Sequence, residues 1–584
     1  MARAGQQVAN QLQDQHDFGN RSRWSYPPVA IKPLRQQANA LLTPPAGKAK
    51  QNDGAEALYS RRMSGSSRRG VTMTMTRDPI SPAATVDGSN APVAVYLVAA
   101  IASLALSVWG AWAQFLPNPD GALYLRSAEL MANGQWKAAI AIYGWPFYGM
   151  TIAAVVKVTG LEPFAAAQVV NAFFSAVTTL AFIALVGRLS NDRLVVICAA
   201  IVIVLQPSLT SFRPSIIRDN CYLACFVLTL YFVCRDLLVP RLWTKLAIGG
   251  AIFLAGLFRI EGFFLAALVL IYYVALRQSV WKNPWVIIIV IGVGLLSIPA
   301  LTFWNSDTQA KLFSGQLDLS GPIANLNRFF DVIGQRLSTL RSGILFPFGG
   351  GNVWGAYVGL VLGVVTVNVV RGITIPVAIL AALSYFPKRL MPRHVNQFVL
   401  WFCFAQLPVL FLYAFWSLVL DKRYAAAMAL VLDIPVAFVL AEAVRQWRSS
   451  LIARVFLPIA AATLIATWGF AVPKPSKLGY LKEAGLWIRD NVPSTARVLT
   501  NDARIAYFSG RSYGPTMAHS FGEPPSDAAL ARFDYLVVQQ NSDDKLLPAV
   551  DRLSGKQFVR SFPGKDGSAV VVYTQQTSGA EGEK

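Results

Sequence analysis

The chain has 584 residues, of which 54% are hydrophobic and only 14% are charged, and its formal net charge is +21. About a quarter of the residues of a soluble domain are charged, so this composition excludes an ordinary soluble protein and indicates a membrane protein. The positive charge does not indicate nucleic acid as a partner. Lys and Arg gather in the N-terminal tail and in short loops, with no aromatic-interleaved basic motif.

Residues 1–91 are polar and show no periodicity, so we expect a disordered, basic tail. No cleavable signal peptide is visible at Met1. Because Met63, Met73 and Met75 lie closer to the first apolar run, we hypothesise that translation begins at one of them. N-terminal sequencing of the native protein tests this hypothesis, and a first residue at Met1 contradicts it.

A helix needs about 20 apolar residues to cross the hydrocarbon core of a membrane. Runs of this kind predict about eleven spans: 92–115, 163–187, 194–210, 220–238, 244–259, 262–277, 285–304, one within 353–386, 396–419, 425–444 and 455–472. The run 353–386 is long enough to cross twice, but two crossings would place the basic segment 387–394 outside. Because that violates the positive-inside bias, we expect one crossing with a broken or partly interfacial helix.

The basic tail is expected to stay in the cytoplasm, which makes 116–162 and 305–352 two long outward loops. The first loop contains amphipathic stretches at 121–133 and 147–160. Both are too short to span, so we expect them to lie along the membrane interface. The second loop contains a helix predicted at 325–341.

Residues 473–584 are polar and predict a small α/β domain on the outward side. Its expected elements are a helix at 478–491, strands at 497–502, 533–540 and 568–576, and a turn of helix after the first strand. All five cysteines lie in apolar segments, which favours small core residues over a disulfide framework. The three histidines are scattered, without the spacing of metal ligands.

Charged residues stand at the outward ends of spans in four places: at Asp120 and in the runs 212–219, 258–262 and 421–424. The positive-inside rule predicts few arginines on this side. The arginines that run against it are Arg213, Arg218, Arg259 and Arg423. A lipid-linked phosphate would explain them, because a planar guanidinium matches phosphate oxygens at two points. A nearby carboxylate can accept the proton of an attacking hydroxyl as general base.

A family resemblance rests on the order of several elements. Asp120 follows the first span, then come the helix ALYLRSAELMANGQW, the element WPFYGM, a second outward charged run and the pair Arg423–Tyr424 before a late span. In this order the chain resembles the C-type glycosyltransferase superfamily over roughly residues 92–520. It is most similar to family 39, which includes protein mannosyltransferases and lipid A aminoarabinose transferases.

The resemblance implies a polytopic α-helical membrane protein, with a transmembrane catalytic domain at 92–472, a long first periplasmic loop and a periplasmic α/β domain. It implies inverting sugar transfer from a polyprenyl-phosphate donor to a lipid, glycan or protein, at the outer face of a bacterial inner membrane. Membrane lipids are the other expected partner. A divalent cation is required by some members of the superfamily and stays open here.

The resemblance also implies roles for single residues. Asp120 is the expected catalytic base, and Asp219 matches a second catalytic acidic residue. Many relatives carry Glu directly after the first acid, where this chain has Gly121. A contribution of that Glu to metal or acceptor binding is therefore missing here or passes to Glu129. The expected ligands of the donor phosphate are Arg213, Arg218, Arg259, Arg423 and Tyr424, with Glu129 and Glu261 in support.

Each of these residues also has a structural interpretation. Asp120 and Asp219 can each cap a helix, and Arg213 and Arg218 can extend to lipid headgroups. Arg259 and Glu261 can form an ion pair with each other. Arg423 and Tyr424 can anchor the chain at the membrane interface. Asp433, inside a span, is expected to make a buried hydrogen bond.

Three other functions stay open: a flippase or transporter of lipid-linked saccharides, a ligase or polymerase that uses the same donors, and a scaffold or receptor. A transporter should show internal repeats and polar sites at mid-membrane, and a ligase should carry its charges in a late outward loop. Charges that gather at one face beside a long first loop therefore favour a transferase. The sequence alone does not identify the sugar, the acceptor or the oligomeric state.

Overall fold

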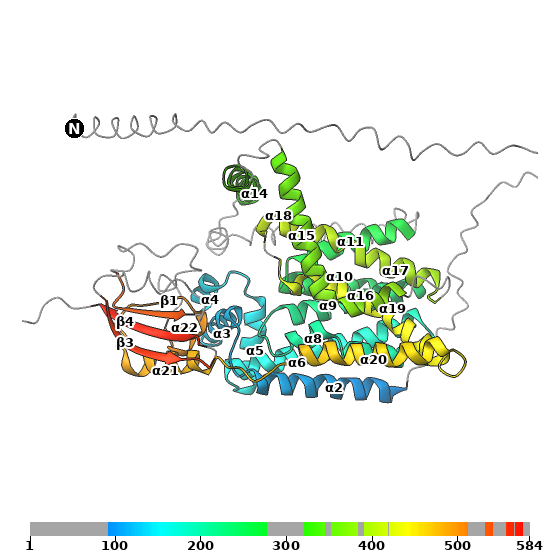
Figure 1. Ribbon diagram of the computed structural model, residues 1–584, viewed down its shortest axis with the longest axis horizontal. Coiled ribbons are helices and arrows are strands. Elements are labelled where there is room, and N and C mark those ends of the chain that lie inside the picture. Colours follow the sequence, from blue (N-terminus) through cyan, green and yellow to red (C-terminus); the bar gives the residue numbers. More distant parts are fainter. Residues whose placement is uncertain are drawn as a thin grey trace, which may run out of the picture. The chain divides into compact units, whose positions relative to one another are not determined.

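The computed structural model of the chain describes residues 92–276, 320–344, 352–383, 390–418, 420–511, 532–540, 556–565 and 567–575. These residues lie within one compact unit, Pro79–Lys584, and are mostly helical, with a small sheet near the C-terminal end (Figure 1). The tail expected over 1–91 and the span expected over 285–304 lie outside the described residues.

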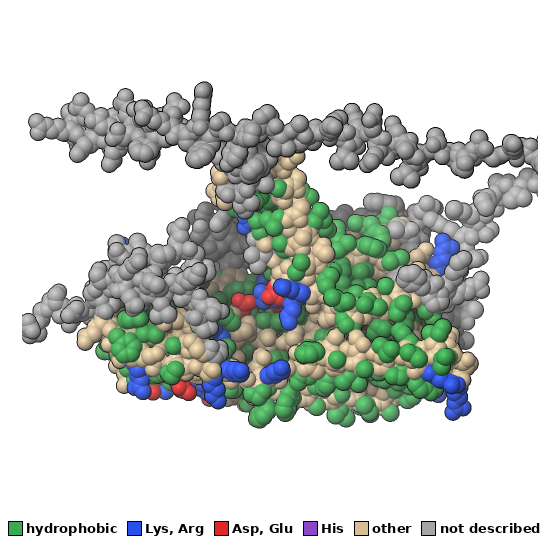
Figure 2. Space-filling view, viewed as in Figure 1, with side chains coloured by type: hydrophobic (Ala, Val, Ile, Leu, Met, Phe, Trp, Pro, Cys, Tyr) green, Lys and Arg blue, Asp and Glu red, His purple; other side chains and the backbone are tan. Residues whose placement is uncertain are grey.

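Eight stretches of the described chain are helical, apolar and long enough to cross a membrane. They are α2 (Val93–Ala113), α6 (Pro163–Leu189), α7 with α8 (Arg193–Val204, Pro207–Phe212), α9 (Asp219–Leu238), α15 (Val353–Ile373), α17 with α18 (Arg393–Phe404, Leu407–Ser417), η5 with α19 (Lys422–Ala425, Ala426–Arg445) and α20 (Leu451–Ala471). Shorter apolar helices are α5 (Phe147–Thr159), α10 (Leu242–Phe258) and α11 (Glu261–Leu276). In Figure 2, hydrophobic side chains cover most of the face that the helices present. A multi-pass helical membrane protein is confirmed, whereas the expected count of about eleven spans is not.

Two of the helical runs are interrupted. Pro207 has no backbone N–H with which to continue α7, and the side chain of Gln206 caps the short helix α8. Thr374, at a φ of 66°, separates α15 from α16 (Ile375–Leu383). Because α16 has only nine residues, it is too short to span. The break expected within 353–386 is therefore present, at Thr374.

The first long loop folds into three helices, α3 (Pro119–Ala132), α4 (Trp136–Ile142) and α5. The stretches that form α3 and α5 were expected from the sequence, and α4 was not. Tyr124 of α3 is buried and meets Tyr143 and Tyr148 edge-on, with ring centroids 4.8 and 5.1 Å away. Trp145 Nε1 donates to the carbonyl of Leu257, which ties the loop to the end of α10. In the second loop, α14 (Ser320–Thr339), followed by η3 (Leu340–Ile344), covers the helix expected at 325–341.

The C-terminal part combines two helices with a four-stranded sheet. Its elements are α21 (Gly479–Asn491), β1 (Val498–Thr500), α22 (Ala503–Phe508), β2 (Tyr535–Gln540), β3 (Lys556–Pro563) and β4 (Ala569–Gln575). The strand order is β1-β2-β4-β3, and only β1 and β2 are parallel. Leu481 and Ile488 of α21 pack against Val537, Val570 and Val572 of the central strands. Every element expected here is present, and β3 is an addition.

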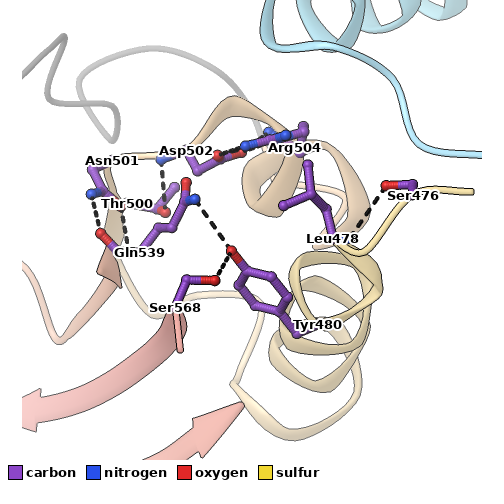
Figure 3. Close-up of polar contacts among 9 residues, drawn as sticks. All are labelled: Ser476, Leu478, Tyr480, Thr500, Asn501, Asp502, Arg504, Gln539 and Ser568. Carbon is purple, nitrogen blue, oxygen red and sulfur yellow. Dashed lines mark hydrogen bonds and ion pairs between the residues drawn. The ribbon is translucent and has the colours of Figure 1, made fainter. Parts of the chain in front are cut away.

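Polar contacts join α21 and α22 to this sheet (Figure 3). The hydroxyl of Tyr480 accepts hydrogen bonds from the Ser568 hydroxyl at 2.8 Å and from Gln539 Nε2 at 3.4 Å. Asp502 follows β1 and caps α22 by accepting from the backbone N–H of Arg504 at 2.8 Å. The Tyr480 contacts join α21 to the sheet, and the Asp502 cap begins α22 directly after β1.

The same helix touches the first loop. α22 packs on α3, and Tyr507 packs against the core of the helical bundle. The backbone N–H of Ser476 donates to the carbonyl of Ala113, the last residue of α2, at 3.0 Å. The C-terminal unit is thus attached at the end of α2 from which the first loop leaves.

Candidate active site

Four stretches of the chain bring charged side chains together beyond the end of α2. They are the start of α3, the start of α9, the turn between α10 and α11, and η5. The residues that gather are Asp120, Arg218, Asp219, Arg259, Glu261, Arg423 and Tyr424. In Figure 2, acidic and basic side chains lie together near the middle of an otherwise largely apolar face.

The carboxylate of Asp120 pairs with Arg423. Arg423 Nη1 donates to Asp120 Oδ2 at 2.9 Å, across 303 residues of sequence. Asp120 lies in the first turn of α3, but the residue at the cap position is Asn118, whose side chain accepts from the backbone of Ile216. The cap interpretation of Asp120 therefore does not hold. Its side chain is 47% exposed, so a soluble molecule can reach the carboxylate.

Gly121 follows Asp120 because there is no room for a side chain. A Cβ at this position would lie 2.7 Å from the side-chain oxygen of Asn118 and 2.9 Å from Cβ of Ile216. The Glu that many relatives carry at this point cannot be accommodated by this backbone. Glu129 does not replace it, because Glu129 pairs with Arg126 at 2.8 Å on the same helix, outside the cluster.

The backbone of Arg423 is held in place from its own turn. Asp421 caps η5 by accepting from the backbone N–H of Arg423 at 2.9 Å. Arg423 Nε is buried and has no hydrogen-bond partner among the described residues. Its contact with Asp120 therefore uses only part of its donor capacity, since a guanidinium offers five N–H donors.

Arg259 is the most enclosed cation of the cluster. It donates to both carboxylate oxygens of Glu261, at 3.1 and 2.6 Å, and its Nη1 pairs with Asp219. Its guanidinium also lies over the ring of Tyr424, 4.4 Å from the centroid, and 5.6 Å from that of Tyr222. The predicted Arg259–Glu261 pair is present. Asp219 is buried, and its contact with Arg259 makes it a tether for that arginine.

Arg218 differs from the other two arginines. It is half-buried over the ring of Tyr143, 5.8 Å from the centroid, and its guanidinium makes no hydrogen bond or ion pair with the described residues. Burial raises the pKa of the neighbouring Tyr124 well above its usual value, although the charge of Arg218 acts in the opposite direction. The Tyr124 hydroxyl stays protonated, so the only carboxylate whose charge acts on Arg218 among the described residues is Glu261.

Aromatic rings line the cluster, and of these rings reasoning from sequence identified only that of Tyr424. Tyr413 stacks on Tyr424 with centroids 4.2 Å apart, and the two hydroxyls are 2.5 Å apart. Together with Tyr143 and Tyr222 they place ring faces next to three arginines. None of these tyrosines except Tyr424 adjoins a charged run in the sequence, so only a pairing across helices could have revealed them.

Arg213 does not join the cluster. Its Nη1 donates to the carbonyl and hydroxyl of Ser103 at 2.7 and 2.8 Å and to the Ser107 hydroxyl at 3.1 Å. The side chain is 1% exposed, so it reaches neither the cluster nor a headgroup.

Asp433 makes the buried hydrogen bond expected of it, accepting from Gln206 Nε2 at 2.7 Å.

The residues of the cluster do not fit a divalent cation. No three His, Cys, Asp or Glu side chains are grouped as metal ligands in the part of the chain that the structure describes. The buried carboxylate of Asp219 and the half-buried carboxylate of Glu261 are already paired with Arg259. The groups that remain available to bind a ligand are guanidinium donors and the exposed carboxylate of Asp120.

Neither a protein-family model nor a curated protein sequence matches the chain. Among solved structures, the chain is similar to the oligosaccharyltransferase of Archaeoglobus fulgidus tethered with an acceptor peptide. The identity is 12% and the TM-score 0.47, with 81% of this chain and 74% of that chain covered. It is also similar to ArnT from Cupriavidus metallidurans in the apo state, at 11% identity and a TM-score of 0.40, with 82% and 97% covered.

Proposed function

We propose that this chain is a membrane glycosyltransferase that moves a sugar from a polyprenyl-phosphate donor to a hydroxyl of a lipid, glycan or protein, with inversion. The observation that carries the proposal is the 2.9 Å contact between Asp120 and Arg423, beside two further arginines at the ends of apolar helices. A donor held in the membrane by its lipid tail and an acceptor arriving from water would meet at such a place.

Arg218 and Arg423 are the proposed ligands of the donor phosphate. Arg218 has no carboxylate partner among the described residues, and Arg423 has donors that Asp120 does not use. Guanidinium groups bind phosphate oxygens through charge-assisted hydrogen bonds. Arg259 is already neutralised by Asp219 and Glu261, so we assign it a positioning role, in which it holds the ring of Tyr424.

Asp120 is the proposed general base. A phosphate oxygen that accepts the hydrogen bond of Arg423 Nη1 would replace the Asp120 carboxylate as its partner. The freed carboxylate then accepts the proton of the acceptor hydroxyl. The acceptor oxygen forms the new bond to the sugar carbon as the bond from that carbon to the phosphate oxygen breaks. The electron pair leaves with polyprenyl phosphate, whose charge the arginines stabilise. A single displacement of this kind inverts the sugar carbon.

We place this reaction on the outer face of a bacterial inner membrane, with the tail 1–91 in the cytoplasm and residues 473–584 in the periplasm. Support comes from the distribution of Lys and Arg, which favours an inward position for the short basic loops such as 445–454.

The base is tested with purified Asp120→Asn protein. The amide keeps the size of the side chain but cannot act as a base, so transfer should fall by about a hundredfold to ten-thousandfold. Transfer is followed by mass spectrometry with lipid-linked sugars extracted from the native membrane. The matched control is Glu129→Gln, an acid on the same helix whose partner is Arg126, and it should stay near wild type. Wild-type turnover by folded Asp120→Asn protein would exclude the mechanism.

The phosphate site is tested with Arg423→Ala protein and undecaprenyl phosphate as the probe. Loss of a charged hydrogen bond should weaken binding about tenfold to a hundredfold. Lys422→Ala removes the neighbouring exposed cation and serves as the control, with an affinity close to wild type. An unchanged affinity in Arg423→Ala, or an equal loss in the control, would contradict a specific phosphate contact.

The same experiments separate the alternative functions. A flippase would move the lipid-linked saccharide without making a new glycosidic bond, and Asp120→Asn would leave the products unchanged. A ligase would transfer a block of several sugars, which appears as a larger mass increase on the acceptor. A single-sugar product that depends on Asp120 supports the transferase.

A further inference from the structure

Arg213 carries a buried charge that the proposed reaction does not use. It follows α8, and its guanidinium reaches Ser103, which lies midway along α2 (Val93–Ala113). An arginine near a membrane surface normally extends toward the headgroups. Arg213 instead extends into the bundle and is 1% exposed, which indicates that something inside the protein compensates it.

The protein itself supplies no counter-charge. No Asp or Glu of the described chain pairs with Arg213, and its Nε and Nη2 are buried without a hydrogen-bond partner there. Arginine does not lose its proton in proteins, so the charge persists. Burying an ion without an opposite charge is costly, and the carbonyl and hydroxyls on Nη1 compensate only part of it.

Two more orphaned donors lie on the helices around this guanidinium. The hydroxyls of Ser175 on α6 and Thr210 on α8 are buried and have no partner among the described residues. Ser175 is one turn from Thr179, whose hydroxyl donates to Ser103 Oγ at 3.2 Å. Thr210 precedes Arg213 by three residues, which places both on one helical face. Unpartnered hydroxyl donors therefore stand on α6 and α8, each one helical turn from a residue of the Arg213–Ser103–Thr179 contact network.

We propose that Arg213 is the centre of an internal binding site for a small monovalent anion of the chloride class. Its free nitrogens and the hydroxyls of Ser175 and Thr210 are the ligands, and every one of them is a hydrogen-bond donor. A phosphate or carboxylate ligand would carry a larger group into a fully buried place, whereas a halide needs only donors and one positive charge. The bound anion would join α2, α6 and α8, and it is independent of the transfer reaction.

The test uses wild-type protein purified in gluconate buffer, to which chloride or bromide is added at constant ionic strength. Thermal unfolding should shift upward by a few degrees and continue to rise with the logarithm of the chloride concentration above Kd. Arg213→Met should abolish the shift and Ser175→Ala should reduce it. Arg489→Met, which removes an exposed arginine, is the matched control and should keep the whole shift.

A bromide-soaked crystal of the wild-type protein provides the second measurement. An anomalous peak beside the Arg213 guanidinium is the expected result, and this experiment does not depend on any variant folding. Water alone at that position, or an unfolding temperature that is equal in chloride and gluconate, would overturn the proposal. Because neither readout involves sugar transfer, the outcome is separate from that of the proposed function.

Discussion

At Arg259 a single guanidinium connects three parts of the bundle. It pairs with Asp219 at the start of α9 and with Glu261 at the start of α11, and it lies over Tyr424 in η5. A buried ion pair is weak evidence for added stability, because desolvation offsets the attraction. Removing one partner is different, since it leaves the other charges buried and unpaired.

Arg259→Met should therefore destabilise the protein by about 3–5 kcal/mol, because the carboxylates of Asp219 and Glu261 lose their partner. The measurement is thermal or denaturant unfolding in detergent. Arg218→Gln is the comparison, because Arg218 has no carboxylate partner among the described residues and should cost much less stability. Arg218→Gln should instead weaken undecaprenyl phosphate binding. Equal stability of the Arg259→Met and wild-type proteins would show that the pair is not structurally important.

The sequence predicted most of the charged cluster and the Arg259–Glu261 pair, but not the pairs of Arg259 with Asp219 and of Arg423 with Asp120. The positive-inside rule expects few arginines on the outward side, so Arg218, Arg259 and Arg423, which lie there, were identified as site candidates. Arg213 met the same criterion, yet it turns toward α2, because a sequence places a residue at a helix end without giving the direction of its side chain. The lack of space at Gly121 also depends on Ile216, a contact across the fold that no local pattern contains.

At the scale of elements, α3 connects the candidate base to the C-terminal unit. Its first turn carries Asp120, and the helix packs on α22. Burial, with the nearby charge of Glu129, raises the pKa of Tyr507 to about 12, so this residue of α22 is neutral near pH 7. Tyr507 acts there as a packing residue, and it can fix the position of α3.

Tyr507→Ala should lower kcat of transfer by about tenfold while leaving undecaprenyl phosphate binding intact, because a small shift of a catalytic group is costly. Tyr507→Phe keeps the ring and should behave like wild type, since the role depends on packing. Transfer kinetics with the native lipid extract provide the measurement. A normal kcat in Tyr507→Ala, or the same loss in Tyr507→Phe, would contradict this positioning role.

Elements with strong periodicity were predictable, and those that depend on neighbours were not. The helix at α21 and the strands β2 and β4 follow clear apolar patterns. The missed strand β3 reads KQFVRSFP, with Lys, Gln, Arg and Ser interrupting the alternation, as suits a strand at the edge of a sheet. The count of about eleven spans is not confirmed, because α10 and α11, with 17 and 16 residues, are shorter than a full crossing and the span expected at 285–304 lies outside the described residues.

For the whole molecule, the proposed orientation can be tested by cysteine labelling. Lys137→Cys in the first loop should react with an impermeant maleimide in cells with a permeabilised outer membrane, and Arg448→Cys only once the inner membrane is opened. Both positions are exposed, and Cys403→Ala removes the native cysteine that is not fully buried. The Cys403→Ala background without an added cysteine is the control. The reverse labelling pattern would place the cluster inside the cell.

The pair Asp120–Arg423 also bears on how the protein is made. Its two halves are 303 residues apart, so a growing polypeptide inserts α2 and α3 long before η5 leaves the ribosome. Until η5 is synthesised, the nascent chain therefore contains Asp120 without its partner Arg423. A chain terminated anywhere before η5 would be inert however well its helices insert, and catalytic competence would begin only when one of the last membrane segments arrives.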